Sequence, residues 1–158
     1  MASTVAEPES RLQVRRMFSA SRPKVFEAWT QREKLEKWMC RADHTIVTRY
    51  TQFDLRTGGT NCMEARTAEG FTYRNKVTFQ EIKPPEKLVF TWGWERFTPT
   101  GEKNEEQDGT LVTVEFVARG TFTEVTLTHE RFRTAEQCER HKKGWEGCFD
   151  QLTGALSP

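Results

Sequence analysis

The C-terminal segment carries the pattern that most limits how this chain can fold. Large or sulfur-bearing side chains recur there at intervals of three and four residues, which places them on one face of a long helix. Thr134 and Gln137 precede this run in the Thr-x-x-Gln order of a capping box and predict where the helix begins. Such a helix needs a second layer to cover its face. The face consists of Cys138, His141, Trp145, Cys148, Phe149, Leu152 and Leu156.

The segment before the helix supplies strands for that second layer. From about Thr45 onward, apolar and polar side chains alternate, as they do in strands with one buried face. Asn75 interrupts the clearest alternation, and Pro84-Pro85 marks a turn because proline cannot continue a central strand. The charged segment from Thr98 to Gly109 predicts an exposed hairpin loop. The clearest strands are expected over residues 12–18, 71–79, 88–94, 111–117 and 122–129.

Two short helices are expected between the first strand and the others. Ser21 followed by Pro23 is typical of a helix start. Thr30 and Glu33 form a Thr-x-x-Glu capping box, which predicts the start of a second helix. The order of elements predicts one α+β domain over residues 11–156, in which a long C-terminal helix packs across a curved antiparallel sheet. Residues 1–10 are expected to form a loose N-terminal tail.

The composition argues against nucleic acid as a partner and against a membrane span. The 158-residue chain has 24 basic and 23 acidic side chains, a formal net charge of +1, and no basic stripe that would neutralise phosphates. Nucleic acid is therefore not an expected partner. No segment approaches the roughly 20 apolar residues of a membrane span, and the N-terminus lacks the basic-then-apolar order of a signal peptide.

The four cysteines predict a reducing compartment. None of Cys40, Cys62, Cys138 and Cys148 stands in C-x-x-C order. Cys138 and Cys148 are placed on one helix, where their spacing separates them by roughly 15 Å. Because a disulfide requires a much closer approach, reduced thiols and a cytoplasmic location are expected.

No residue pattern assigns a catalytic or metal site. Cys138 and His141 share a helix face near His129, but such a set has low specificity for a metal, and no metal or cofactor is expected. The chain has no G-x-S-x-G motif, and no Ser or Cys has a recognisable base beside it. Polar residues near the strands are expected to face outward or to form structural ion pairs. These residues are Asp54, Arg56, Asn75, Glu81 and Arg119.

Aromatic side chains and helix glycines admit two interpretations. The chain has eleven Phe, five Trp and two Tyr, which can either fill a core or wall a pocket. Gly144 and Gly147 lie inside the predicted C-terminal helix, where each glycine costs roughly 1 kcal/mol relative to alanine. They serve either a close approach of helix to sheet or a space kept open for a ligand.

An ordered set of short motifs covers residues 11–156. The motifs are Arg16-Met-Phe-Ser-Ala-Ser-Arg-Pro23, Val25-Phe26-x-Ala28-Trp29-Thr30, Leu35-x-x-Trp38, Asp54-Leu-Arg-Thr-Gly-Gly59, the segment from Glu81 to Trp92, the segment from Thr123 to His129, and His141-x-x-Gly144-Trp145. With these motifs in this order, the chain resembles the activator-of-Hsp90-ATPase-homologue family of the START-like, or birch-pollen-allergen-like, SRPBCC superfamily. The resemblance implies a helix-grip fold, in which the sheet wraps around the C-terminal helix and leaves a cavity between them.

The resemblance also implies a class of ligand. Members of the superfamily hold lipids, sterols, polyketides or other apolar molecules in this cavity, so a small, mostly apolar molecule of lipid or polyketide type is the expected partner. The residues expected to line its site are Trp38, Met39, Met63, Tyr73, Val77, Phe90, Trp92 and Trp145.

Two alternative functions follow from the same resemblance. A cyclase- or hydrolase-type enzyme would need a buried titratable group in the cavity. A chaperone-linked module would bind an Hsp90-type protein. Stimulation of the Hsp90 ATPase is not expected, because the eukaryotic co-chaperone uses an additional N-terminal domain for activation. Monomer and homodimer are both compatible with the sequence.

Overall fold

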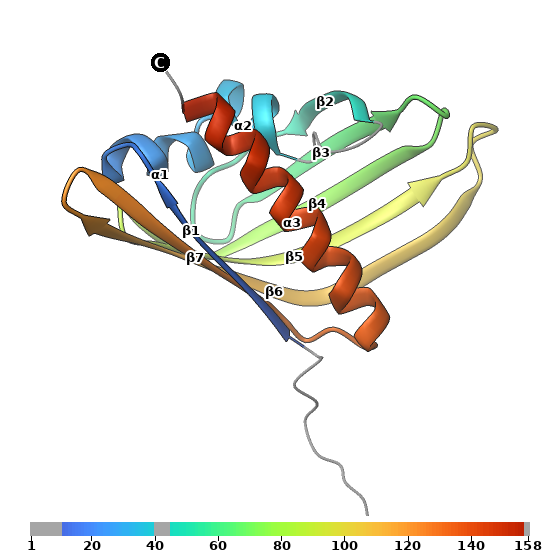
Figure 1. Ribbon diagram of the computed structural model, residues 1–158. Helices are drawn as coiled ribbons and strands as arrows, with labels where there is room; N and C mark the ends of the chain where they lie inside the picture. Colours follow the sequence, from blue (N-terminus) through green and yellow to red (C-terminus); the bar gives the residue numbers. More distant parts are fainter. Residues whose placement is uncertain (1–10, 40–44, 157–158) are drawn as a thin grey trace, which may run out of the picture.

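The computed structural model describes residues 11–39 and 45–156. Over these residues the chain forms three helices and a seven-stranded antiparallel sheet (Figure 1). The helices are α1 (Arg22–Thr30), α2 (Arg32–Trp38) and α3 (Ala135–Leu156). The strands are β1 (Arg11–Phe18), β2 (Thr45–Gln52), β3 (Thr60–Thr67), β4 (Thr72–Lys83), β5 (Lys87–Phe97), β6 (Lys103–Arg119) and β7 (Phe122–Glu130).

The sheet curves around the C-terminal helix. Its strand order is β1-β7-β6-β5-β4-β3-β2, so consecutive strands from β2 to β7 are neighbours and β1 closes the edge beside β7. Figure 1 shows α3 crossing the concave side of the sheet, with α1 and α2 near its C-terminal end. This arrangement confirms the predicted α+β helix-grip fold.

The two short helices form where expected, but their caps differ from the prediction. Ser21 occupies the N-cap position of α1, yet its side chain makes no capping hydrogen bond. The N-cap of α2 is Gln31 and not Thr30. Thr30 instead ends α1, and its hydroxyl donates to the carbonyl of Phe26 at 2.9 Å. The predicted capping box at Thr30 is therefore wrong, because that hydroxyl is already used within the preceding helix.

The start of α3 confirms half of the second predicted capping box. The Thr134 hydroxyl accepts a hydrogen bond from the Gln137 backbone N–H at 3.0 Å. The reciprocal bond does not form, because the Gln137 side-chain oxygen is buried with no hydrogen-bond partner within the described part of the chain.

The predicted loop between Thr98 and Gly109 is a strand over most of its length. β6 begins at Lys103 and pairs with β5 through this charged segment, with Glu105 opposite Arg96 and Gln107 opposite Trp94. The side chains lack apolar alternation because Glu105 and Gln107, on the inner face, find polar partners there. The strand is therefore invisible to hydrophobic periodicity.

One half of the concave face is solidly packed, and we call it the packed half. Phe149 and Leu152 of α3 are fully buried there, and the Phe149 ring lies 5.7 Å from that of Phe18 and 6.0 Å from that of Trp29, centroid to centroid. Phe116 of β6 joins the same cluster at 6.0 Å from Trp29. α3 is thus anchored by its C-terminal turns on β1 and the short helices.

Several predictions fall outside the described residues. These are the N-terminal tail over residues 1–10 and the reduced thiol of Cys40. Within the described ranges, no helix combines the length and apolarity that a membrane crossing requires.

Candidate functional site

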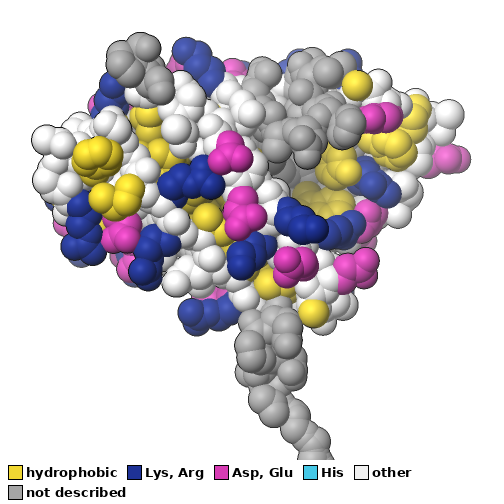
Figure 2. Space-filling view, in the orientation of Figure 1, with side chains coloured by type: hydrophobic (Ala, Val, Ile, Leu, Met, Phe, Trp, Pro, Cys, Tyr) yellow, Lys and Arg dark blue, Asp and Glu magenta, His cyan; other side chains and the backbone are white. Residues whose placement is uncertain are grey.

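Between the N-terminal half of α3 and the sheet lies a cavity of about 560 Å³ that is open to solvent on one side. α3 covers it with residues from Arg140 to Cys148, and the inner faces of β3, β4 and β5 form its floor. Figure 2 shows a hollow beside α3 in which hydrophobic side chains are visible, surrounded by charged side chains of both signs. A volume of this size lies in the usual range for a small-molecule pocket.

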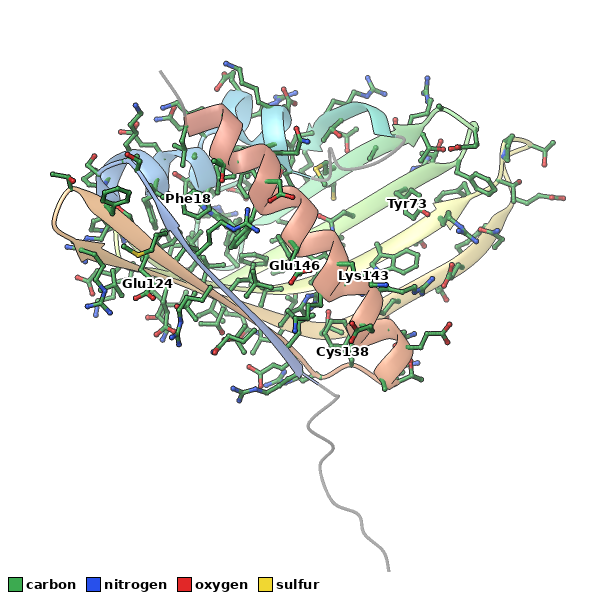
Figure 3. The ribbon with its side chains drawn as sticks, in the orientation of Figure 1. Phe18, Tyr73, Glu124, Cys138, Lys143 and Glu146 are labelled. Carbon is green, nitrogen blue, oxygen red and sulfur yellow. The ribbon has the colours of Figure 1, made fainter. Side chains whose placement is uncertain are left out.

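Most of the cavity wall is apolar. Aromatic and sulfur-bearing side chains come from the strands, and α3 contributes Gly144, Trp145 and Cys148. Figure 3 shows Tyr73 rising from β4 on the side of the sheet that faces α3. Among the residues that the structure describes, the lining is Met39, Met63, Ala65, Thr67, Glu69, Phe71, Tyr73, Asn75, Trp92, Trp94, Glu105, Arg140, His141, Gly144, Trp145 and Cys148.

The structure brings five of the eight predicted site residues together in this wall. They are Met39, Met63, Tyr73, Trp92 and Trp145. Trp38 lies in the packed core, where its ring is 4.7 Å from that of Trp29 and its indole N–H donates to the Ala28 carbonyl at 2.9 Å. Val77 and Phe90 are likewise buried in the core and do not line the cavity.

Gly144 leaves room where α3 passes over the cavity. A Cβ atom added at this position would meet nothing within 4 Å outside the neighbouring helix backbone. Close contact with the sheet therefore does not require glycine here. Of the two interpretations of this residue, the structure favours the one in which glycine keeps space open.

Charged residues gather at one side of the cavity. Glu105 accepts from Arg140 at 2.8 Å and lies 3.4 Å from a guanidinium nitrogen of Arg96. Arg96 also donates to the Tyr73 hydroxyl at 3.4 Å and stands over the Phe71 ring at 5.1 Å. These groups largely satisfy one another, so they make a polar edge to an apolar space.

His129 lies behind the cavity wall and is fully used by the protein. Its Nδ1 accepts from the Trp145 indole N–H at 3.0 Å, and its Nε2 lies 2.9 Å from the Thr110 hydroxyl. That hydroxyl donates to the Trp92 carbonyl at 2.7 Å, so Nε2 must carry the proton and donate to Thr110. Burial, with a smaller effect of His141, lowers the pKa of His129 from 6.5 to about 2. This imidazole is therefore a neutral structural connector.

His141 is the titratable ring that reaches the cavity itself. Its Nδ1 lies 2.8 Å from the Gln137 carbonyl, and its Nε2 lies 3.2 Å from the Trp94 indole nitrogen on β5. Burial is the main cause that lowers its pKa below 6.5; the bond to Gln137 opposes this shift and Arg140 adds to it. The enzyme alternative required a buried titratable group in the cavity, and His141 is a partly buried one.

Sequence reasoning missed several residues of this site. Asn75 was expected to face outward, but it is buried, lines the cavity and donates through Nδ2 to the Gly93 carbonyl at 2.9 Å. Its position in the alternation, between Tyr73 and Val77, was the available signal for an inward orientation. Glu105 gave no such signal, because its segment has no apolar period. Asp54 and Arg119 do form the expected ion pairs, with Arg56 at 3.0 Å and with Glu124 at 2.9 Å.

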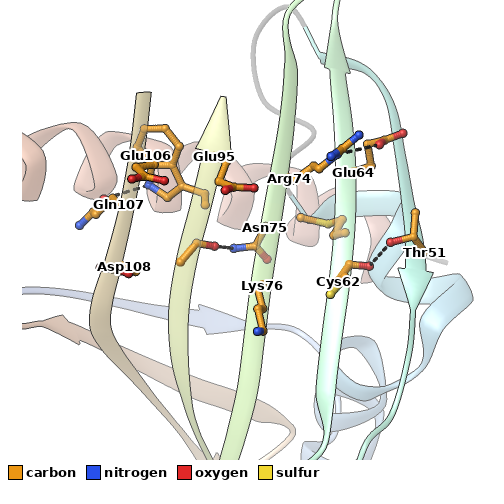
Figure 4. A pocket seen from close by; sticks show the side chains of 13 residues that line it. Thr51, Cys62, Glu64, Arg74, Asn75, Lys76, Glu95, Glu106, Gln107 and Asp108 are labelled. Carbon is orange, nitrogen blue, oxygen red and sulfur yellow. Dashed lines mark hydrogen bonds and ion pairs between the residues drawn. The ribbon is translucent and has the colours of Figure 1, made fainter. Parts of the chain in front are cut away.

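A second, more polar hollow of about 680 Å³ lies on the side of the sheet away from α3 (Figure 4). Its charged side chains are of both signs, and many pair with one another or with a neighbour. Arg74 contacts Glu64 at 3.4 Å, and Lys103 contacts both Glu95 and Glu106, at 3.3 and 2.8 Å. We assign no ligand to it. No group of three His, Cys, Asp or Glu side chains in residues 11–39 and 45–156 is placed to hold a metal ion.

Comparison with solved structures shows the same fold in bacterial proteins. Protein CV1439 from Chromobacterium violaceum has a TM-score of 0.79 and 21% identity, covering 94% of this chain and 99% of that one. Protein Mll3558 from Rhizobium loti has a TM-score of 0.74 and 23% identity, covering 93% and 96%. A protein from Arthrobacter aurescens has a TM-score of 0.77 and 18% identity, covering 97% and 90%.

Sequence comparison gives the family. None of the curated proteins matches this chain. The family model described as "Activator of Hsp90 ATPase homolog 1-like protein" matches residues 19–157, which is most of the chain. Helix-grip fold, ordered motifs and family match agree, and the chain belongs to the family of activator of Hsp90 ATPase homolog 1-like proteins.

Proposed function

We propose that this protein binds a small, mostly apolar molecule in the cavity between α3 and the sheet. The observation that carries the proposal is a space of about 560 Å³ whose wall is built from Trp, Tyr, Phe and Met side chains. A monomeric protein gains stability by filling such a space with its own side chains, so an unfilled apolar space favours a ligand-binding role.

Two features of the wall favour a ligand-binding site over a packing defect in the hydrophobic core. The open space lies beside Gly144, where an added Cβ atom would meet nothing within 4 Å. The flexible side chains of Met39 and Met63 face the same space and can adapt to ligands of different shape. Binding would be driven by burial of apolar surface, at about 25 cal/mol per Å² before the costs of association.

Filling the cavity from α3 tests the proposal. We expect the wild-type protein to bind the uncharged fluorescent probe N-phenyl-1-naphthylamine and the Gly144→Leu variant to lose this binding. Gly154→Leu is the matched control, because Gly154 also lies in α3 with nothing within 4 Å of an added Cβ but does not line the cavity. Fluorescence titration of the three proteins measures the outcome.

Two results would contradict the proposal. The absence of binding to the wild-type protein argues against an apolar ligand site. Equal binding by the Gly144→Leu variant and the wild type places the probe elsewhere on the molecule. Native mass spectrometry of protein purified from its own cells complements the titration, since a co-purifying mass identifies the class of the natural ligand.

A further inference from the structure

The polar atoms of the cavity wall show which chemical groups a ligand can present there. Most of these atoms already have a partner in the protein. The Tyr73 hydroxyl accepts a hydrogen bond from Arg96, and Glu105 accepts one from Arg140. The Asn75 amide donates to the Gly93 carbonyl. A ligand gains little by competing for these groups, because each exchange breaks one hydrogen bond to form another.

His141 differs because its orientation is fixed while one nitrogen stays available. The Gln137 carbonyl, 2.8 Å from Nδ1, can only accept, so Nδ1 carries the proton. In the neutral ring Nε2 then has a lone pair, and it faces from α3 toward Trp94 on β5. Because both His141 and Trp94 line the cavity, this lone pair lies at its wall.

The protein satisfies that lone pair only in part. The Trp94 indole N–H lies 3.2 Å from Nε2, but the same N–H lies 2.9 Å from the Gln107 side-chain oxygen. One N–H shared by two acceptors gives the shorter bond the larger part of its strength. If Trp94 stays with Gln107, Nε2 is free to accept a stronger donor.

We propose that His141 Nε2 accepts a hydrogen bond from a hydroxyl group on the ligand, so that this site takes an apolar ring system bearing a phenolic or alcoholic hydroxyl. This inference rests on the proposed function and specifies the ligand class for the same cavity. Ring systems suit the wall formed by Trp92, Trp94 and Trp145.

Hydrogen-bonding capacity and the cost of desolvation disfavour the other groups that could meet this nitrogen. A carbonyl or carboxylate oxygen only accepts and would face the lone pair of Nε2 without a proton between them. A cationic donor would lose its hydration on entering a mostly apolar space, which costs more than one hydrogen bond to Nε2 returns. A hydroxyl is neutral and donates to Nε2 while the Trp94 N–H keeps its bond to Gln107.

Three related probes separate the hydroxyl from the ring. We would titrate the wild-type protein at pH 7 with naphthalene, 2-methoxynaphthalene and 2-naphthol, which share a fused ring and differ in hydrogen-bonding capacity. The methoxy oxygen accepts but cannot donate. We expect 2-naphthol to bind about tenfold more tightly than 2-methoxynaphthalene, the ratio that one net buried hydrogen bond supplies.

Variants of His141 assign the effect to one nitrogen. His141→Leu removes the acceptor, and we expect its preference for 2-naphthol over 2-methoxynaphthalene to fall to about twofold or less. His141→Gln places an amide oxygen at a similar reach and should retain a preference for 2-naphthol. Lys143→Leu is a matched control on the exposed side of α3, where Figure 3 labels Lys143, and should behave as wild type.

The outcomes distinguish this inference from the proposed function. Equal affinity of the wild-type protein for 2-naphthol and 2-methoxynaphthalene overturns the hydroxyl assignment while leaving the apolar cavity function intact. Failure of all three probes to bind overturns both. A preference that persists unchanged in His141→Leu overturns the role of His141. The first comparison uses only the wild-type protein, so the folding of a variant does not decide it.

Discussion

The two ends of α3 meet the same sheet in different ways. Toward its C-terminus, Phe149 and Leu152 are fully buried in the packed half, where Phe149 packs against Phe18 of β1 and Trp29 of α1. Toward its N-terminus, Gly144 and His141 face a cavity of about 560 Å³. One continuous amphipathic helix therefore does two things: its later turns fix its position on the sheet, and its earlier turns cover an open space.

The buried His129 and the partly buried His141 show the same difference on a smaller scale. His129 has both ring nitrogens satisfied, by Trp145 and Thr110, and none of its surface is exposed. His141 has one nitrogen fixed by Gln137 and shares an N–H for the other. A fully satisfied polar group belongs to the structure, whereas a partly satisfied group beside a cavity is available to a ligand.

The largest expected effect is on the packed half. Phe149→Ala should lower the free energy of unfolding by about 3–5 kcal/mol, because it removes a fully buried ring that contacts Phe18 and Trp29. Tyr73→Ala, on the cavity side, should cost less than about 2 kcal/mol, since the half-buried ring borders open space. Urea denaturation of both variants measures the difference. Equal losses would mean that the cavity wall is as tightly packed as the core.

The second effect compares the histidines directly. His129→Leu leaves the buried Trp145 N–H without its acceptor and should destabilise the protein by about 1–3 kcal/mol. His141→Leu should change stability by less than about 1 kcal/mol, because Trp94 keeps its bond to Gln107. The same denaturation experiment tests both. A larger loss for His141→Leu than for His129→Leu would reverse the roles assigned to the two rings.

The third effect depends on pH. The pKa of His129 is lowered to about 2 in the folded protein, against 6.5 for an ordinary histidine, so the unfolded chain binds more protons between these values. Stability is therefore complete above about pH 6.5 and falls as the pH decreases, by up to about 1.4 kcal/mol per pH unit from this residue. His141, whose pKa is also lowered, acts in the same direction.

His129→Leu serves as the control for this pH dependence. Denaturation at pH 7, 6 and 5 should show a smaller loss of stability in the variant than in the wild-type protein. Near pH 5 the slopes of unfolding free energy against pH should differ by an amount that corresponds to nearly one bound proton. An unchanged slope would show that other groups, and not the buried imidazole, govern the acid sensitivity.

The sequence predicted the fold well because hydrophobic period determines it. The buried face of α3 and the alternation along β4 and β5 follow directly from apolar spacing, and both are confirmed. The start of β6 could not be predicted in this way, because Glu105 and Gln107 reach the inner face with polar partners contributed by Arg140 and Trp94. Those partners are distant in sequence, so local composition suggested a solvated loop.

The cavity was harder to predict than the fold for a related reason. Alternation tells which side chains face inward, but it does not separate a filled interior from a hollow one. Trp92 and Phe90 share a face of β5 and are both buried, yet only Trp92 lines the cavity. Whether an inward side chain meets a filled or a hollow interior depends on the residues that α3 places opposite it, which is a property of two elements together.

The smallest expected effect tests why glycine stands at position 144 of α3. Gly144→Ala should raise the free energy of unfolding by up to about 1 kcal/mol, since alanine favours helix and its Cβ would meet nothing within 4 Å. Gly154→Ala, also in α3, should give a similar gain for the same reason. Thermal denaturation of the two variants measures both. If Gly144→Ala loses stability while Gly154→Ala gains it, α3 approaches the sheet closely at Gly144, and glycine is there for packing. If both gain, close packing against the sheet is not the reason for glycine at position 144, and the probe titration of the Gly144→Leu variant decides whether the space beside it holds a ligand.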